Sequence, residues 1–116
     1  MMPDEPLRLY PIVRGLELLP AGQPTDNPAS VLGSAQLAQV FEELLGFYHY
    51  IIVDTPPVLR YADANLVQAL VDAVIVVART GVSRTDMVSR AIQRLPRQKI
   101  LGTILTGVDA KTLSTK

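Results

Sequence analysis

Short runs of apolar, often β-branched residues alternate along this chain with stretches whose apolar residues recur every three or four positions. Runs that are apolar on both faces are typical of strands in a parallel sheet that helices cover on each side. The sequence therefore predicts an α/β fold of three layers, with a mainly parallel sheet of about four strands flanked by helices. The expected strands are residues 16–19, 50–53, 71–78 and 100–105.

Helices are expected between these strands. They span residues 30–46, residues 64–70, and a stretch that is capped by Ser83 or Thr85 and ends before Pro96. Right-handed crossovers between parallel strands place their carboxyl ends at one edge of the sheet. We therefore expect the loops after the four strands to lie together and to form any small-molecule site.

The length of 116 residues allows one small domain, since about 150 residues per domain is the usual expectation. We expect an arm or loop at residues 1–14, an α/β domain at residues 15–109 and a tail at residues 110–116. The chain is 48% apolar and 19% charged, which excludes a disordered protein. The absence of cysteine excludes disulfides and thiolate metal sites, and the single His49 excludes a histidine cluster.

Charge is divided unevenly along the chain, although the formal net charge is zero. Residues 1–78 hold three basic and nine acidic residues, whereas residues 79–116 hold eight basic and two acidic residues. The basic half contains a ridge of arginines at helical spacing, formed by Arg90, Arg94 and Arg97. Such a ridge is either a solvated face or a contact for an acidic partner or an anionic membrane surface. No aromatic residue interleaves with it, so no nucleic acid partner is expected.

Nothing in the sequence resembles a targeting or membrane-spanning segment. The N-terminal residues lack a basic region followed by an apolar one, and no apolar run approaches the roughly 20 residues of a membrane span. We therefore expect a cytoplasmic location, extending to the inner face of the cell membrane if a membrane partner holds the chain there.

The sequence Ile-Ile-Val-Asp-Thr-Pro-Pro at residues 51–57 places Asp54 at the end of an expected buried strand. Two successive prolines cannot continue the ladder of a sheet, so the strand ends there. An aspartate at such a strand end can hold the water of a Mg²⁺ ion beside a phosphate, as a Walker B acid does. The other interpretation is an aspartate that caps the loop, and the residues alone leave both open.

Five motifs, in order along the chain, resemble the bacterial tyrosine autokinases of capsule and exopolysaccharide assembly, a family related to the ParA/MinD group of deviant Walker ATPases. They are GLELLPAG (15–22), NPASVL (27–32), YHYIIVDTPPVLRYADA (48–64), VDAVIVVART (71–80) and ILGTILTGVD (100–109). The resemblance implies a P-loop NTPase-like fold, protein-tyrosine kinase activity, and ATP and Mg²⁺ as cofactors.

The same resemblance implies roles for particular residues. Asp54 is expected to be catalytic and to hold Mg²⁺ through water, but only in a completed site. Thr55 and Pro56 are expected to shape the nucleotide loop. Thr106 stands where the family commonly has an asparagine that contacts the nucleotide, and the alternative is that this threonine only ends its strand.

Two motifs of the family's nucleotide site are absent from this sequence: the P-loop that ends in Gly-Lys-Ser/Thr and the deviant Walker acid strand. The lysines are Lys99, Lys111 and Lys116, and none has the place of the P-loop lysine. A P-loop supplies the N–H groups and the cation that neutralise a triphosphate, whereas Asp54 alone adds negative charge. We therefore expect a partial fold that lacks the P-loop strand, with no ATP bound by this chain alone.

The first hypothesis for function is the C-terminal portion of a tyrosine autokinase-like ATPase domain, inactive on its own. Its partner is expected to be the missing P-loop half or another copy of the chain. Because the strand at residues 50–53 would lack a neighbour, we expect a rearranged sheet, a strand-exchanged oligomer, or a chain that normally works joined to its missing N-terminal half. Two alternatives stay open: a noncatalytic module that docks to a membrane polysaccharide copolymerase, and a fragment of a ParA/MinD-type partition ATPase.

Overall fold

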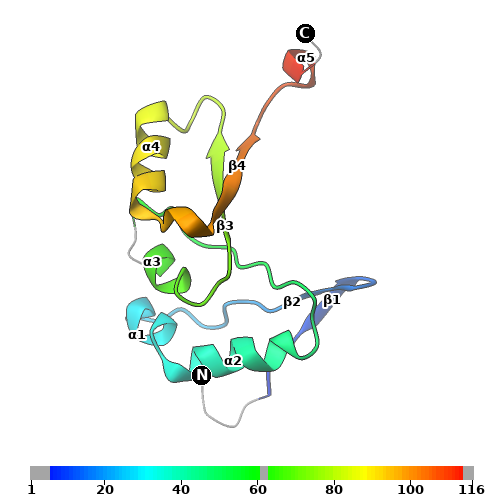
Figure 1. Ribbon diagram of the computed structural model, residues 1–116. Helices are drawn as coiled ribbons and strands as arrows, with labels where there is room; N and C mark the ends of the chain where they lie inside the picture. The colour runs from blue at the N-terminus through cyan, green and yellow to red at the C-terminus, as the bar shows by residue number, and fades with distance from the viewer. Residues whose placement is uncertain (1–5, 61–62, 114–116) are drawn as a thin grey trace.

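The computed structural model describes residues 6–60 and 63–113. The elements in chain order are β1 (Tyr10–Val13), β2 (Leu16–Leu18), α1 (Pro28–Leu32), α2 (Ala35–Leu45), α3 (Asp63–Val67), β3 (Val74–Arg79), α4 (Thr85–Arg94), the 3-10 helix η1 (Arg97–Lys99), β4 (Ile100–Thr106) and α5 (Ala110–Leu113). The predicted α/β class is confirmed (Figure 1). Parts of the predicted arm (1–5) and tail (114–116), and residues 61–62 of the third motif, lie outside the described residues.

The strands form two separate pairs. β1 and β2 are antiparallel, whereas β3 and β4 are parallel, with Val76 opposite Thr103 and Arg79 opposite Thr106. The parallel pair is the part of the predicted sheet that the structure confirms. The prediction of a single sheet of about four strands is wrong for the described residues, because one expected strand is not formed and another pairs elsewhere.

Residues 50–53, predicted to be a strand, run without regular structure between α2 and α3 (Figure 1). The Tyr50 and Ile52 side chains are 88% and 92% exposed. A strand needs a neighbour whose N–H and C=O groups pair with its own, and no described strand pairs with this segment. An apolar β-branched run indicates that a segment suits a half-buried strand. It does not indicate whether another strand is present to pair with that segment.

The carboxyl ends of β3 and β4 meet, as predicted. The Thr80 N–H donates a hydrogen bond of 3.0 Å to the Thr106 carbonyl just beyond the pair. The prediction that all four strand ends gather at this edge is otherwise wrong, because β2 belongs to the other pair and residue 53 ends no strand.

β1 and β2 form a hairpin where the sequence predicts an arm or loop through residue 14. Gly15 has a φ of +83°, a left-handed conformation that other side chains resist, and this lets the chain reverse between the strands. Pro11 has no N–H to give to a sheet, but both members of a two-stranded pair are edge strands, where proline is tolerated. The prolines of this region therefore mark an edge and do not exclude a strand.

The helix predicted over residues 30–46 is divided into two, α1 and α2. The Asn27 side chain accepts a hydrogen bond of 3.1 Å from the Ser30 N–H and caps α1. Ser34 Oγ accepts one of 3.2 Å from the Leu37 N–H and caps α2. Each cap satisfies an N–H group that a helix start leaves unpaired. The apolar residues at helical spacing begin at Leu37, so they predict α2 but not a continuous helix from residue 30.

The helix predicted before Pro96 is confirmed as α4, but its predicted caps are wrong. Arg84 has the capping position and makes no capping hydrogen bond through its side chain, and Thr85 is the first helical residue. Ser83 Oγ instead accepts a hydrogen bond of 2.9 Å from the Arg79 N–H. The hydroxyl thus closes the turn after β3, a use that helix-start patterns do not distinguish from capping.

The described core is small and centres on α4 and the β3–β4 pair. Figure 1 shows α4 alongside the pair. Ala78 of β3, Ala91 of α4 and Leu95 just after α4 are 6%, 7% and 9% exposed, respectively. This packing holds one face of the pair against a helix, as expected for an α/β layer.

The other face of the pair, which we call the open face, carries Ile75, Val77 and Ile104. Val77 lies opposite Ile104 in the register, and successive side chains of a strand point to opposite faces. The three side chains are 51%, 64% and 49% exposed, in the order named. On the other side of the pair, Ala78 is buried, but Leu105, which lies opposite Ala78 in the register, is still 59% exposed. One face of the pair is therefore open, and the other is covered over β3 alone.

Lys99, in η1, ties the start of β4 to the region after α3. Its Nζ donates hydrogen bonds of 2.7 Å to the Gln68 carbonyl and 2.9 Å to the Val71 carbonyl. A cation that satisfies two carbonyls near a helix end stabilises that end. Lys99 therefore contacts residues that lie 31 and 28 positions before it in the sequence.

Replacing Leu95 with alanine should lower the free energy of unfolding by about 2–4 kcal/mol, because the side chain is buried against α4 and the pair. The matched control is Leu101→Ala, since Leu101 on β4 is 74% exposed and its loss should cost less than about 1 kcal/mol. Urea unfolding followed by circular dichroism measures both changes. Equal losses would contradict the described core.

Replacing Lys99 with methionine keeps most of the apolar stem and removes both hydrogen bonds. The free energy of unfolding should fall by about 1–2 kcal/mol, because two carbonyls lose a charged donor. Arg97→Met is the control, because Arg97 is exposed on the same turn. A control variant as destabilised as Lys99→Met, compared by thermal unfolding, would show that the two hydrogen bonds carry no stability.

Candidate functional site

Asp54, Thr55 and Pro56, three of the predicted site residues, follow one another on the irregular segment after residue 53 and are all exposed. Across residues 6–60 and 63–113, Asp54 has no ion pair. Thr106 lies at the end of β4. Three of the four predicted residues are therefore close together only because they are adjacent in sequence. Asp54 does not follow a strand, in contrast to the prediction.

Thr106 links the two strands of the parallel pair at their carboxyl ends. Its Oγ1 donates a hydrogen bond of 3.3 Å to the Ala78 carbonyl on the neighbouring strand. The chain then turns at Gly107, whose φ is +68°, and a Cβ there would lie 3.3 Å from Arg79 Cγ. The hydroxyl is thus used within the fold, as a strand-ending residue would use it, and a nucleotide contact from Thr106 stays a prediction.

The described residues do not by themselves fit Mg²⁺ or ATP. In the part of the chain that the structure describes, no three His, Asp or Glu side chains gather to hold a metal ion. Asp54 is a single exposed carboxylate on a segment without regular structure. A triphosphate needs several N–H donors and a cation around it, and this segment supplies a negative charge instead.

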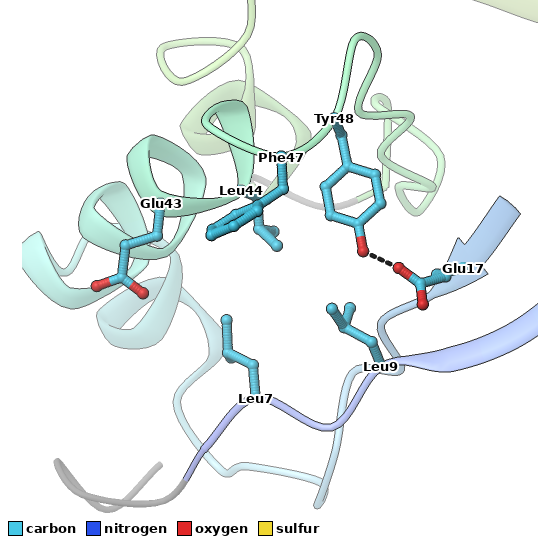
Figure 2. Close-up of a pocket in the computed structure, with 7 residues that line it drawn as sticks. All are labelled: Leu7, Leu9, Glu17, Glu43, Leu44, Phe47 and Tyr48. Carbon is cyan, nitrogen blue, oxygen red and sulfur yellow. Dashed lines mark hydrogen bonds between the residues drawn. The ribbon is translucent and has the colours of Figure 1, made fainter. Parts of the chain in front are cut away.

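A pocket that the sequence did not predict lies between the hairpin and the end of α2 (Figure 2). We call it the acidic pocket. Its volume is about 450 Å³, and it is lined by Leu7, Leu9, Glu17, Glu43, Leu44, Phe47 and Tyr48. The strands and helix that form it could be read from the sequence in part, but the pairing of β1 with β2 that brings Glu17 beside α2 could not.

The Tyr48 hydroxyl donates a hydrogen bond to the Glu17 carboxylate across this pocket (Figure 2). This hydrogen bond raises the pKa of Tyr48 above its ordinary value of 10.0, because the bond is lost when the phenol ionises. Partial desolvation and the negative charge of Glu17 raise the pKa further. The contact joins two residues 31 positions apart and holds the hairpin against the end of α2.

Known proteins similar to this chain are bacterial tyrosine-protein kinases. The chain is 36% identical to tyrosine-protein kinase etk of Escherichia coli K12 over 96 residues. The matched residues make up 81% of this chain and 13% of that kinase. The chain is 32% identical over 95 residues to the putative tyrosine-protein kinase CapB of Staphylococcus aureus, or 80% of this chain and 42% of CapB. Tyrosine-protein kinase YwqD of Bacillus subtilis is 31% identical over 94 residues, which is 79% of this chain and 40% of YwqD.

These similarities confirm the family recognised from the motifs: the chain is homologous to a portion of bacterial tyrosine-protein kinases. The chain spans between 13% and 42% of the length of these three relatives. No protein-family model matches the sequence. Within the described ranges, no helix has the length and apolar character needed to cross a membrane.

Replacing Glu17 with glutamine should lower the pKa of Tyr48 toward the ordinary value of about 10, because the charged acceptor is removed. Since folding raises this pKa, the contact stabilises the protein fully below the unfolded value of 10.0 and is lost as pH rises through the folded value. NMR titration of the tyrosine ring carbons, with the Tyr48 signal assigned through Tyr48→Phe, measures the change. Glu43→Gln is the control, because Glu43 lines the same pocket. A Tyr48 pKa that is the same in the Glu17→Gln variant and the parent would refute the assigned contact.

Proposed function

We propose that this chain is the C-terminal portion of a tyrosine autokinase-type ATPase domain that acts in capsule or exopolysaccharide synthesis and export. Its homology to bacterial tyrosine-protein kinases supports the proposal, as does the order of the five motifs. In this proposal the chain supplies the Walker B aspartate, Asp54, and a segment outside this sequence supplies the P-loop. The chain alone is inactive.

The observation that carries the proposal is the apolar surface that the fold leaves uncovered. The open face exposes Ile75, Val77 and Ile104, and the segment predicted to be a strand at residues 50–53 exposes Tyr50 and Ile52. Single exposed apolar residues are ordinary, but a whole sheet face and a β-branched run left uncovered together indicate an interaction surface. A P-loop-bearing segment whose strand pairs with residues 50–53 and whose helix packs on the open face would cover both.

Such a strand would also change the setting of Asp54. Pairing would draw residues 50–53 into the sheet, and Asp54 would then stand at a strand end at the carboxyl edge. Thr55 and Pro56 would follow as the loop of the completed site. The carboxylate could then hold the water of a Mg²⁺ ion, while the P-loop N–H groups and lysine would neutralise the phosphates of ATP.

Charge explains why one half alone is inactive. Phosphoryl transfer depends on positioning the phosphates and on neutralising their charge. The described residues offer neither a P-loop nor a lysine beside Asp54. The affinity for ATP therefore depends on the segment that carries the P-loop.

The proposed setting in the cell follows from the proposed function. The partner segment carries the P-loop and is a separate chain or a further part of the same protein. A membrane polysaccharide copolymerase would hold the assembly at the inner face of the cell membrane, with the chain itself in the cytoplasm. The relatives reported above are named as tyrosine kinases and lend no support to a partition ATPase.

Calorimetric titration with Mg²⁺-ATP tests the proposal. The chain alone should show no binding at ATP concentrations up to about 1 mM. The chain co-expressed with the portion of CapB that it does not match, which the proposal expects to carry the P-loop, should bind with a Kd in the micromolar range. Asp54→Asn should weaken the Mg²⁺-dependent binding by at least about tenfold. Asp72→Asn, a matched change at an exposed aspartate, should leave it unaltered.

Two results would contradict the proposal. One is micromolar binding of Mg²⁺-ATP by this chain alone, since the described residues carry no cradle for the phosphates. The other is co-expressed material that binds ATP equally well with and without the Asp54 carboxylate.

A further inference from the structure

A strongly basic stretch lies on and around α4. Residues 79–99 hold six basic residues and one acidic residue, which gives a formal charge of +5 within a chain that is neutral overall. Arg90 and Arg94 belong to α4, and Arg97 begins η1 three residues after Arg94. We call these three residues the arginine ridge. Such a concentration of charge of one sign attracts anionic surfaces.

The packing of α4 turns the arginine ridge away from the strand pair. Ala91 of α4 and Leu95 just after it are buried, so the side on which they lie faces β3 and β4. Arg90 and Arg94 are four residues apart and therefore neighbours, one turn apart, on another side of the helix. Both are exposed, as is Arg97. Figure 1 shows α4 at the margin of the molecule, with the strand pair on one side of it and no other described element on the other. The ridge is therefore accessible from outside the molecule.

Acidic neighbours neutralise the arginine ridge only in part. Asp86 pairs with Arg84 at 3.1 Å and with Arg90 at 3.5 Å. All three side chains are more than half exposed, and an ion pair in water contributes little free energy. Arg94 and Arg97 make no ion pair with any residue that the structure describes. Two of the three arginines are therefore free to bind an anion, and the third can exchange its partner at little cost.

The ridge suits lipid head groups better than an acidic protein. A specific protein interface has an apolar or aromatic centre that excludes water. From residue 84 to residue 99, Met87 is the only large apolar side chain that is exposed, at 37%. A layer of anionic head groups needs no such centre, because it attracts basic side chains by charge. Its phosphates also match the planar guanidinium, which can donate two hydrogen bonds to one phosphate.

We propose that the arginine ridge holds this chain directly against a membrane surface that contains anionic phospholipids. Arg94 and Arg97 pair with the phosphate groups of the lipids, and Arg90 joins them by exchanging Asp86 for a phosphate. The contact lies on the surface of the bilayer and inserts no helix into it. It is independent of the proposed nucleotide site and needs no membrane protein as an intermediary.

The distribution of charge along the chain would orient this contact. Residues 79–116 carry a formal charge of +6, whereas residues 1–78 carry one of −6. An anionic surface attracts the first part and repels the second, so the chain should meet the membrane with α4 toward it. The acidic pocket, which belongs to the repelled part, would then face away from the lipids.

Cosedimentation of the chain with lipid vesicles tests the proposal. Vesicles of phosphatidylglycerol and phosphatidylcholine in about equal amounts should bind the chain in about 50 mM NaCl, and binding should weaken by at least about tenfold in about 500 mM NaCl. Vesicles of phosphatidylcholine alone should bind at least about tenfold less, because they carry no net charge. Equal binding to both kinds of vesicle, or no binding to either, would overturn the proposal. The chain is used alone, so the result does not depend on a P-loop segment.

Substitutions locate the contact on the ridge. Arg94→Gln combined with Arg97→Gln should weaken binding to the mixed vesicles by at least about tenfold, because each basic residue near an anionic surface contributes about fivefold. The matched control is Arg14→Gln with Arg60→Gln, which removes the same charge from two exposed arginines of the acidic part. The control should lose less than about threefold. Circular dichroism verifies that both variants retain the parent fold. A control as weakened as the test variant would overturn the proposal.

Polyglutamate distinguishes lipid from acidic protein as the partner. This soluble polymer presents carboxylates without phosphates or a surface. At equal concentrations of negative charge, the chain should bind polyglutamate at least about tenfold more weakly than the mixed vesicles. Equal or tighter binding to polyglutamate, lost in the variant with Arg94→Gln and Arg97→Gln, would assign the ridge to an acidic protein and overturn the proposal.

Discussion

Everything else in this structure depends on a parallel strand pair that has one open face and one partly covered face. Ala78 of β3, Ala91 of α4 and Leu95 just after α4 are three of the few buried apolar residues of the described chain, whereas Leu105, opposite Ala78, is 59% exposed. Parallel strands normally have helices on both faces, since each face is apolar. Here the open face stays in contact with water. The stability of the pair therefore depends on the packing of α4 alone. The uncovered face is also what a partner segment can use, which connects the architecture to the proposed function.

Much of the fold could be predicted from local patterns, because local patterns determine local structure. The apolar runs at β3 and β4 and the apolar stripe of α4 each contain their own periodicity, and their parallel arrangement follows from the helix between them. The strand expected at residues 50–53 failed because a strand depends on a neighbour that no local pattern reveals. The division between α1 and α2 was missed because the apolar stripe begins only at Leu37, and Ser34 caps a new helix just before it.

The candidate site, like the fold, could be predicted from the sequence only in part. The motif around Asp54 identified the family, which the relatives confirm, because family motifs are a property of sequence alone. The role of Asp54 depends on a sheet edge that the described chain does not complete, and so it stays a prediction. The acidic pocket could not be predicted at all, since Glu17 and Tyr48 meet only through the hairpin. Contacts between distant residues require the fold, and contacts between molecules require a partner.

Hydrogen exchange of the backbone amides at residues 51–53 tests the central claim most directly, namely that this segment becomes a strand when the strand of a P-loop-bearing segment pairs with it. In the chain alone these amides should exchange at the rate of an unstructured peptide, because no neighbouring strand accepts their hydrogen bonds. In the complex with the portion of CapB that this chain does not match, they should be slowed by at least about a hundredfold. Slow exchange in the isolated chain, or unchanged exchange in the complex, would contradict the account.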